Sequence, residues 1–167
     1  MIVGKLNGNK LMVLVVKTSI AYLIFIVVMF TLPIYKQAYK IFGSAIDEIY
    51  ASRVVIGETS LTVRIANDSV SRTSGLSNVA ELGEKNGVFF IFDQADYHGI
   101  WMKDMLFSID IIWIDQNMEV VHIEQNISPN TFPKTFIPNK KSLYVLETNA
   151  GFVKKHGIKI GDVVTRL

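Results

Sequence analysis

The sequence predicts a mostly β domain, a compact small barrel or sandwich of about seven short strands and two short helices, preceded by one transmembrane helix. Short apolar or alternating segments recur from residue 53 onward, and turn residues separate them. An uncharged run at residues 18–34 precedes all of these segments. The chain has 167 residues and no cysteine, which excludes a disulfide framework, thiolate metal sites and a cysteine nucleophile.

The N-terminal segment has the pattern of a signal-anchor. The run 18–34 is long enough for a short transmembrane helix, and the apolar stretch 11–16 can extend it because the stem of Lys17 reaches towards lipid headgroups. Residues 1–40 contain five lysines and no acid, and three of these lysines lie before the uncharged run. This bias predicts a single-pass protein of the cell membrane, with residues 1–17 in the cytoplasm and the globular domain on the extracytoplasmic side.

A cleaved signal peptide is the alternative for the same segment. The apolar run is long for such a peptide, and no small-residue cleavage site follows it promptly, since Gly43-Ser44-Ala45 lies about ten residues beyond its end. Residues 35–58 are the expected connector, either an amphipathic helix or a simple tether, with a weak strand at 53–56. Both readings of the N-terminal segment place the domain outside the cytoplasm.

Alternation and capping residues define the first elements of the globular domain, which is expected at 59–167. Apolar residues alternate with polar ones at 60–66, which predicts a half-buried strand. Asp68 can cap a short helix over 69–74, and Gly75 ends that helix as a left-handed C-cap.

The remaining elements follow from apolar runs between turn residues. Strands are expected at 88–92, 99–102, 109–114, 118–124, 142–148 and 162–165. Asp115-Gln116-Asn117 joins two of these strands into a hairpin. Three prolines place 126–142 in a long loop, and a short helix at 150–156 ends at Gly157.

Three motifs of this domain resemble the bacterial and archaeal family known as domain of unknown function 192. They are RTSGLS at 72–77, IWMKDMLFSIDIIWID at 100–115 and YVLETNAGFVKKHGIKIGDVV at 144–164. The resemblance covers about residues 60–167 and implies a small, mostly β domain behind a signal peptide or anchor, with no established activity. Two departures concern the loop before Ile109: Asp104 stands where the family usually has Asn, and Phe107-Ser108 stands where it usually has Ile-Pro.

Four residues are candidates for a small polar ligand pocket: Trp101, Lys103, Asp110 and Glu147. Asp110 interrupts an apolar strand, where an unpaired carboxylate costs several kcal/mol. We expect Lys103 or the backbone amides of 104–108 to satisfy it, either as a structural contact or within a ligand site. Glu147 lies at the end of another strand, where it could cap the helix that follows or belong to the same site. Trp101 is either core filler or a wall of the pocket.

These residues support a membrane-anchored binding or interaction module better than an enzyme. A hydrolase that uses Asp110 and Glu147 as an acid/base pair and a purely structural envelope protein are the alternatives. The expected partners are the membrane, through 18–34, and a small polar ligand or an envelope protein. Nucleic acid is not expected, because residues 41–167 carry 12 basic and 15 acidic side chains, a net charge of −3.

No cofactor or metal ion is predicted. Copper could bind His98, Met102 and Met105, but methionines of an apolar β domain usually belong to its core. The sequence also contains no G-x-S-x-G elbow and no glycine-rich phosphate loop.

Overall fold

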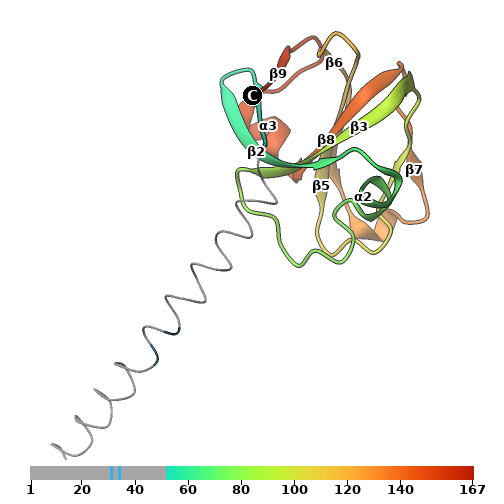
Figure 1. Ribbon diagram of the computed structural model, residues 1–167. Helices are drawn as coiled ribbons and strands as arrows, with labels where there is room; N and C mark the ends of the chain where they lie inside the picture. The colour runs from blue at the N-terminus through green and yellow to red at the C-terminus, as the bar shows by residue number, and fades with distance from the viewer. Residues whose placement is uncertain (1–30, 32–33, 35–51) are drawn as a thin grey trace, which may run out of the picture. The chain divides into compact units, whose positions relative to one another are not determined.

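The structure, a computed structural model, describes residues 31, 34 and 52–167 (Figure 1). The predicted cytoplasmic segment, nearly all of the predicted transmembrane helix and most of the predicted connector lie outside these described residues. No helix in the described part of the chain is long and apolar enough to cross a bilayer. Residues 52–167 belong to one compact unit, which runs from Glu48 to Leu167.

The mostly β class is confirmed. A seven-stranded mixed sheet has the order β6-β5-β8-β3-β2-β1-β9, and only β2 and β3 pair in parallel. Its strands are β1 (Ser52–Ile56), β2 (Thr59–Ala66), β3 (Asn86–Asp96), β5 (Ile109–Ile114), β6 (Val120–Ile127), β8 (Ser142–Asn149) and β9 (Val164–Arg166). A separate two-stranded sheet pairs β4 (Ile100–Trp101) with β7 (Thr135–Phe136). The two short helices are α2 (Ser69–Ser74) and α3 (Phe152–His156).

The large sheet curls into a half-barrel (Figure 1). Its edge strands β6 and β9 approach each other at one end, where a bridge joins Glu119 to Val163. The N–H of Val120 also donates to the carbonyl of Asp162 at 2.9 Å. Curling lets all seven strands contribute to one inner core, which α3 completes. This inner core consists of Val54, Ile56, Leu61, Val63, Phe89, Ile112, Ile114, Val120, Leu146, Phe152, Val153, Ile158 and Val164.

A second core, the outer core, covers the other face of the sheet. It consists of Ala66, Leu76, Leu82, Val88, Phe90, Ile100, Met102, Met105, Ile109, Ile111, Trp113, Val121, Ile127, Phe136 and Val145. Successive residues of a strand point to opposite faces, so Ile111 and Trp113 enter the outer core while Ile112 and Ile114 enter the inner one. Burial on both faces explains why every residue of β5 is buried and why all of them except Asp110 are apolar.

Three parts of the chain differ in detail from the sequence predictions. The weak strand expected in the connector is β1, which pairs with both β2 and β9. The expected strand at 99–102 shortens to β4 and leaves the large sheet for its own pairing with β7. The long loop 126–142 contains β7 and a 3-10 turn at Pro129–Thr131. Strand β7 was not predicted, because two residues are too few to show an alternating apolar pattern.

Candidate functional site

A cavity of about 370 Å³ opens on the outer face of the large sheet, beside α2. Phe90 and Phe92 of β3, together with Ile100 and Trp101 of β4, form its aromatic and apolar wall. Arg72 of α2 and Glu147 of β8 are the charged residues that line it. The cavity is the site towards which the sequence-predicted Trp101 and Glu147 converge; Lys103 and Asp110 do not line it.

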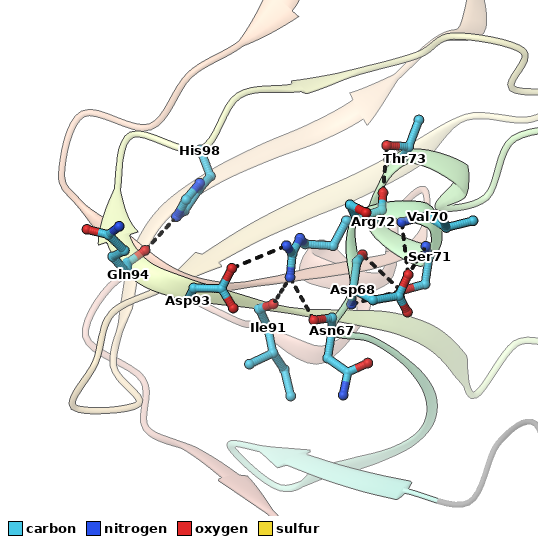
Figure 2. Close-up of polar contacts among 11 residues, drawn as sticks. Asn67, Asp68, Val70, Ser71, Arg72, Thr73, Ile91, Asp93, Gln94 and His98 are labelled. Atoms are coloured by element: carbon cyan, nitrogen blue, oxygen red, sulfur yellow. Dashed lines mark hydrogen bonds and ion pairs between the residues drawn. The ribbon is translucent and has the colours of Figure 1, made fainter.

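Helix α2 is held in place by a capping box at its first turn (Figure 2). The carboxylate Oδ1 of Asp68 accepts hydrogen bonds from the N–H groups of Val70 and Ser71, each at 2.9 Å. The helix ends at Gly75 as predicted, although its φ of 44° and ψ of −124° lie outside the left-handed helical region expected there. Only glycine adopts this backbone conformation without strain, so Gly75 can bring the chain close to β3 and β8.

Arg72 ties α2 to β3 (Figure 2). Its Nη1 donates to the carbonyl oxygens of Asn67 at 2.8 Å and of Ile91 at 2.9 Å. Its Nη2 reaches the exposed carboxylate of Asp93 only at 3.5 Å, and its guanidinium lies 5.4 Å from the centre of the Phe92 ring. Arg72 is not among the site residues predicted from the sequence; the one signal that could have found it is its place in the RTSGLS motif.

Glu147 is the unusual residue of the cavity. Its side chain is buried, with 4% of the residue exposed, and its Oε2 atom has no hydrogen-bond partner. A Cβ placed on Gly75 would lie 3.6 Å from this oxygen, so the carboxyl group lies directly against the turn that ends α2. Burial raises the pKa of Glu147 to about 8, and the positive charge of Arg64 opposes this rise.

Arg64 supports the same turn from β2. Its guanidinium donates to the carbonyl oxygen of Gly75, which fixes the backbone beside Glu147. Arg64 therefore lies behind the cavity wall, whereas Arg72 lines the cavity itself.

Trp101 lies at the mouth of the cavity, with 48% of the residue exposed. The edge of its ring meets Phe132, with the ring centres 6.1 Å apart. Lys103 is exposed and places its Nζ 5.8 Å from the centre of the Trp101 ring, outside the cavity wall. Its carbonyl oxygen accepts a 2.8 Å hydrogen bond from Ser77, which fastens this loop to the segment after α2.

Asp110 is fully buried on the other face of the sheet. Its Oδ1 accepts from the N–H of Asn126 at 2.8 Å, and its Oδ2 accepts from the N–H of Val153 at 2.9 Å. These partners are neither Lys103 nor the amides of 104–108 expected from the sequence. A bulge between β5 and β6 frees the first N–H, and the first turn of α3 supplies the second.

The register of β5 against β8 separates the two carboxyl groups. Ile111 pairs with Glu147, so Glu147 shares the outer face with Ile111, while Asp110 points towards the inner core. The geometry therefore does not assemble the acid/base pair considered from the sequence. Glu147 does not cap α3 either, since Asp110 accepts the N–H in its first turn.

The residues considered for copper are used otherwise. Met102 and Met105 are buried in the outer core, and His98 stacks on Phe92 with ring centres 3.6 Å apart. Figure 2 shows His98 beside Gln94, whose carbonyl oxygen lies 2.9 Å from its Nε2 atom. Among the described residues, no group of three or more His, Cys, Asp or Glu side chains could hold a metal ion.

Comparison with known proteins identifies the family. Residues 52–166 match the model of domain of unknown function 192 (DUF192), described as "Uncharacterized ACR". The chain belongs to this family. The DUF192 domain thus runs from β1 to β9, and the cavity beside α2 lies wholly within it.

Two crystal structures are similar to this DUF192 domain. One is a protein of unknown function from Novosphingobium aromaticivorans, with 28% identity and a TM-score of 0.65 over 68% of this chain and 83% of that one. The other, from Sinorhizobium meliloti, is described as a "putative transcription regulator" and has 28% identity and a TM-score of 0.65 over 70% of this chain and 95% of that one. No curated protein was found to match the chain.

Proposed function

We propose that the DUF192 domain of this chain is a binding module for a small organic ligand, which places a polar group against Glu147 and its body against the aromatic wall. The observation that carries this proposal is the unpartnered Oε2 atom of Glu147, buried beside the cavity. A buried polar atom without a partner costs about 1–3 kcal/mol. A ligand group that hydrogen-bonds to this oxygen would remove that cost.

The size and lining of the cavity support the same proposal. Its volume of about 370 Å³ falls within the roughly 300–1,000 Å³ typical of small-molecule sites. Apolar walls with a few polar groups are the usual composition of such sites, and the ring of Trp101 at the mouth offers a flat surface for stacking.

The two alternative functions fit these residues less well. A hydrolase with Asp110 and Glu147 as its acid and base needs both groups on one substrate, whereas they face opposite sides of the sheet. A purely structural role suits Asp110, whose two oxygens are both satisfied by backbone N–H groups. It does not account for Glu147, which joins no such network.

The predicted anchor belongs to the same proposal: residues 18–34 would hold the binding module at the extracytoplasmic face of the cell membrane. Because the chain has no cysteine, a single introduced cysteine is the one thiol of the protein that a maleimide can label. Its labelling therefore shows on which side of the membrane that residue lies. Lys140→Cys in the domain should react with a membrane-impermeant maleimide in intact cells, and Asn9→Cys should react only after lysis. The opposite labelling pattern would overturn this placement.

Titration of the full chain in detergent micelles with benzyl alcohol and benzamide tests the binding function. We expect saturable binding, followed by calorimetry, that weakens at least tenfold in Glu147→Ala and also weakens in Trp101→Ala. The matched controls are Glu124→Ala, a carboxylate outside the cavity, and Tyr97→Ala, an exposed aromatic residue that does not line it. Equal affinity in Glu147→Ala and in the wild type would show the proposal to be wrong, as would the absence of binding by these two probes and by their charged analogues benzoate and benzylamine.

A further inference from the structure

We infer that the ligand of this cavity is an organic anion, such as a carboxylate, which accepts a hydrogen bond from the carboxyl group of Glu147 and faces the guanidinium of Arg72. This inference rests on the proposed function and names the class of ligand that the same site would take.

The charges around Glu147 favour an anionic ligand. Arg64 of β2 faces it and Arg72 of α2 lines the same cavity, whereas the neighbouring parts of β3, β5 and the turn after α2 contribute uncharged residues. Asp110 points to the opposite face, and Asp93 touches Arg72 from an 83% exposed position. Two guanidinium groups therefore stand against one carboxyl group, so an anion is attracted and an organic cation is repelled.

The protonation state of Glu147 also favours an anionic ligand. Burial favours its uncharged form, because a carboxylate loses its hydration in an apolar cavity. The rise of its pKa to about 8 agrees with this geometry. An uncharged carboxyl group has an O–H donor, so its natural partner is an acceptor, and a carboxylate oxygen is among the strongest acceptors.

The hydrogen bonds of Arg72 leave one of its nitrogen atoms available to a ligand. Both of its Nη1 bonds go to backbone carbonyls, which hold the side chain rigidly against Phe92. Its Nη2 has only the 3.5 Å contact with the exposed Asp93, so this nitrogen can donate to a ligand anion at small cost. Arg72 and Glu147 line the same cavity as Trp101, so a flat anion that packs against the Trp101 ring can meet both of them.

Three probes of similar size and different charge test this inference on the full chain in detergent micelles: benzoate, benzamide and benzylamine. At pH 6 we expect benzoate to bind at least tenfold more tightly than benzylamine, with benzamide in between. Because binding needs the proton of Glu147, whose pKa is about 8, benzoate should bind roughly tenfold more weakly at pH 9 than at pH 6. Benzamide should show a much smaller change.

Two variants separate hydrogen bonding from charge. Glu147→Gln keeps an N–H donor at every pH, so benzoate should bind within about threefold of the wild-type affinity at pH 6 and lose its pH dependence. Asp93→Asn removes the exposed carboxylate from Arg72 and should tighten benzoate about twofold to fivefold, without changing benzamide. Glu124→Gln, on β6, is the matched control for both variants and should change nothing.

The outcomes distinguish this inference from the proposed function. Preference for benzylamine overturns the anion inference and leaves a binding module for cations. Binding of benzoate that strengthens between pH 6 and pH 9 overturns the hydrogen bond from the Glu147 carboxyl group on which the inference depends. Binding of benzamide alone overturns the anion inference and leaves a binding module for uncharged polar ligands. If none of the three probes binds, the proposed function itself fails.

Discussion

Asp110 and Glu147 are buried carboxyl groups on neighbouring strands, and the sequence alone does not distinguish them. The structure places them at adjacent pairs of the β5–β8 ladder, facing opposite cores. Each oxygen of Asp110 accepts a backbone hydrogen bond, whereas Oε2 of Glu147 accepts none and lies beside a cavity. Burial of a carboxyl group is therefore not by itself a sign of function. The sign is burial without a partner, next to space that a ligand can fill.

The largest expected effect comes from the satisfied member of the pair. Asp110→Ala leaves the N–H groups of Asn126 and Val153 buried without acceptors, and each loss costs about 1–3 kcal/mol. We expect the free energy of unfolding to fall by roughly 2–6 kcal/mol, measured by urea denaturation of the full chain in micelles with the buried Trp113 as fluorescent reporter. The exposed Asp96→Ala is the control and should cost less than about 0.5 kcal/mol. A small effect at Asp110 would mean that its hydrogen bonds do not hold α3 to the sheet.

The unpartnered member of the pair, Glu147, should make the stability of the domain depend on pH. The folded protein keeps the Glu147 proton up to a pKa of about 8, while the unfolded chain loses it near the ordinary value of 4.5. Between these two values the folded state binds more protons, so stability falls as pH rises, on the order of 1 kcal/mol per pH unit, and levels off above about 8.

Glu147→Gln removes this titration. We expect its free energy of unfolding to exceed that of the wild type at pH 8 and to lose the slope between pH 5 and pH 8, measured by urea denaturation at each pH. Glu124→Gln controls for the loss of a carboxylate elsewhere and should keep the slope. A slope that persists in Glu147→Gln would show that other groups cause it.

The two carboxyl groups also show how far the sequence could predict the fold and the site. Apolar alternation and capping residues were enough for β5, β8 and α2, because these elements are determined by local pattern and by burial. The partners of Asp110 could not be predicted, because Asn126 and Val153 reach it through a bulge and a helix terminus that are 16 and 43 residues away in the chain. Which face Glu147 occupies depends on strand register, and a shift by one residue would reverse it.

The smallest expected effect concerns Lys103, which the sequence grouped with Trp101, Asp110 and Glu147. In the structure its only contact with that group is a cation–π contact of 5.8 Å with the exposed Trp101 ring, a geometry worth about 0.5 kcal/mol at a surface. Lys103→Ala should therefore change the free energy of unfolding by no more than about 0.5 kcal/mol, measured by the same denaturation. It should also leave benzoate affinity within about twofold, since the charge lies outside the cavity wall and is screened by salt. A loss of affinity comparable to that of Glu147→Ala would place Lys103 in the binding site and would mean that the loop at 102–108 closes over the ligand.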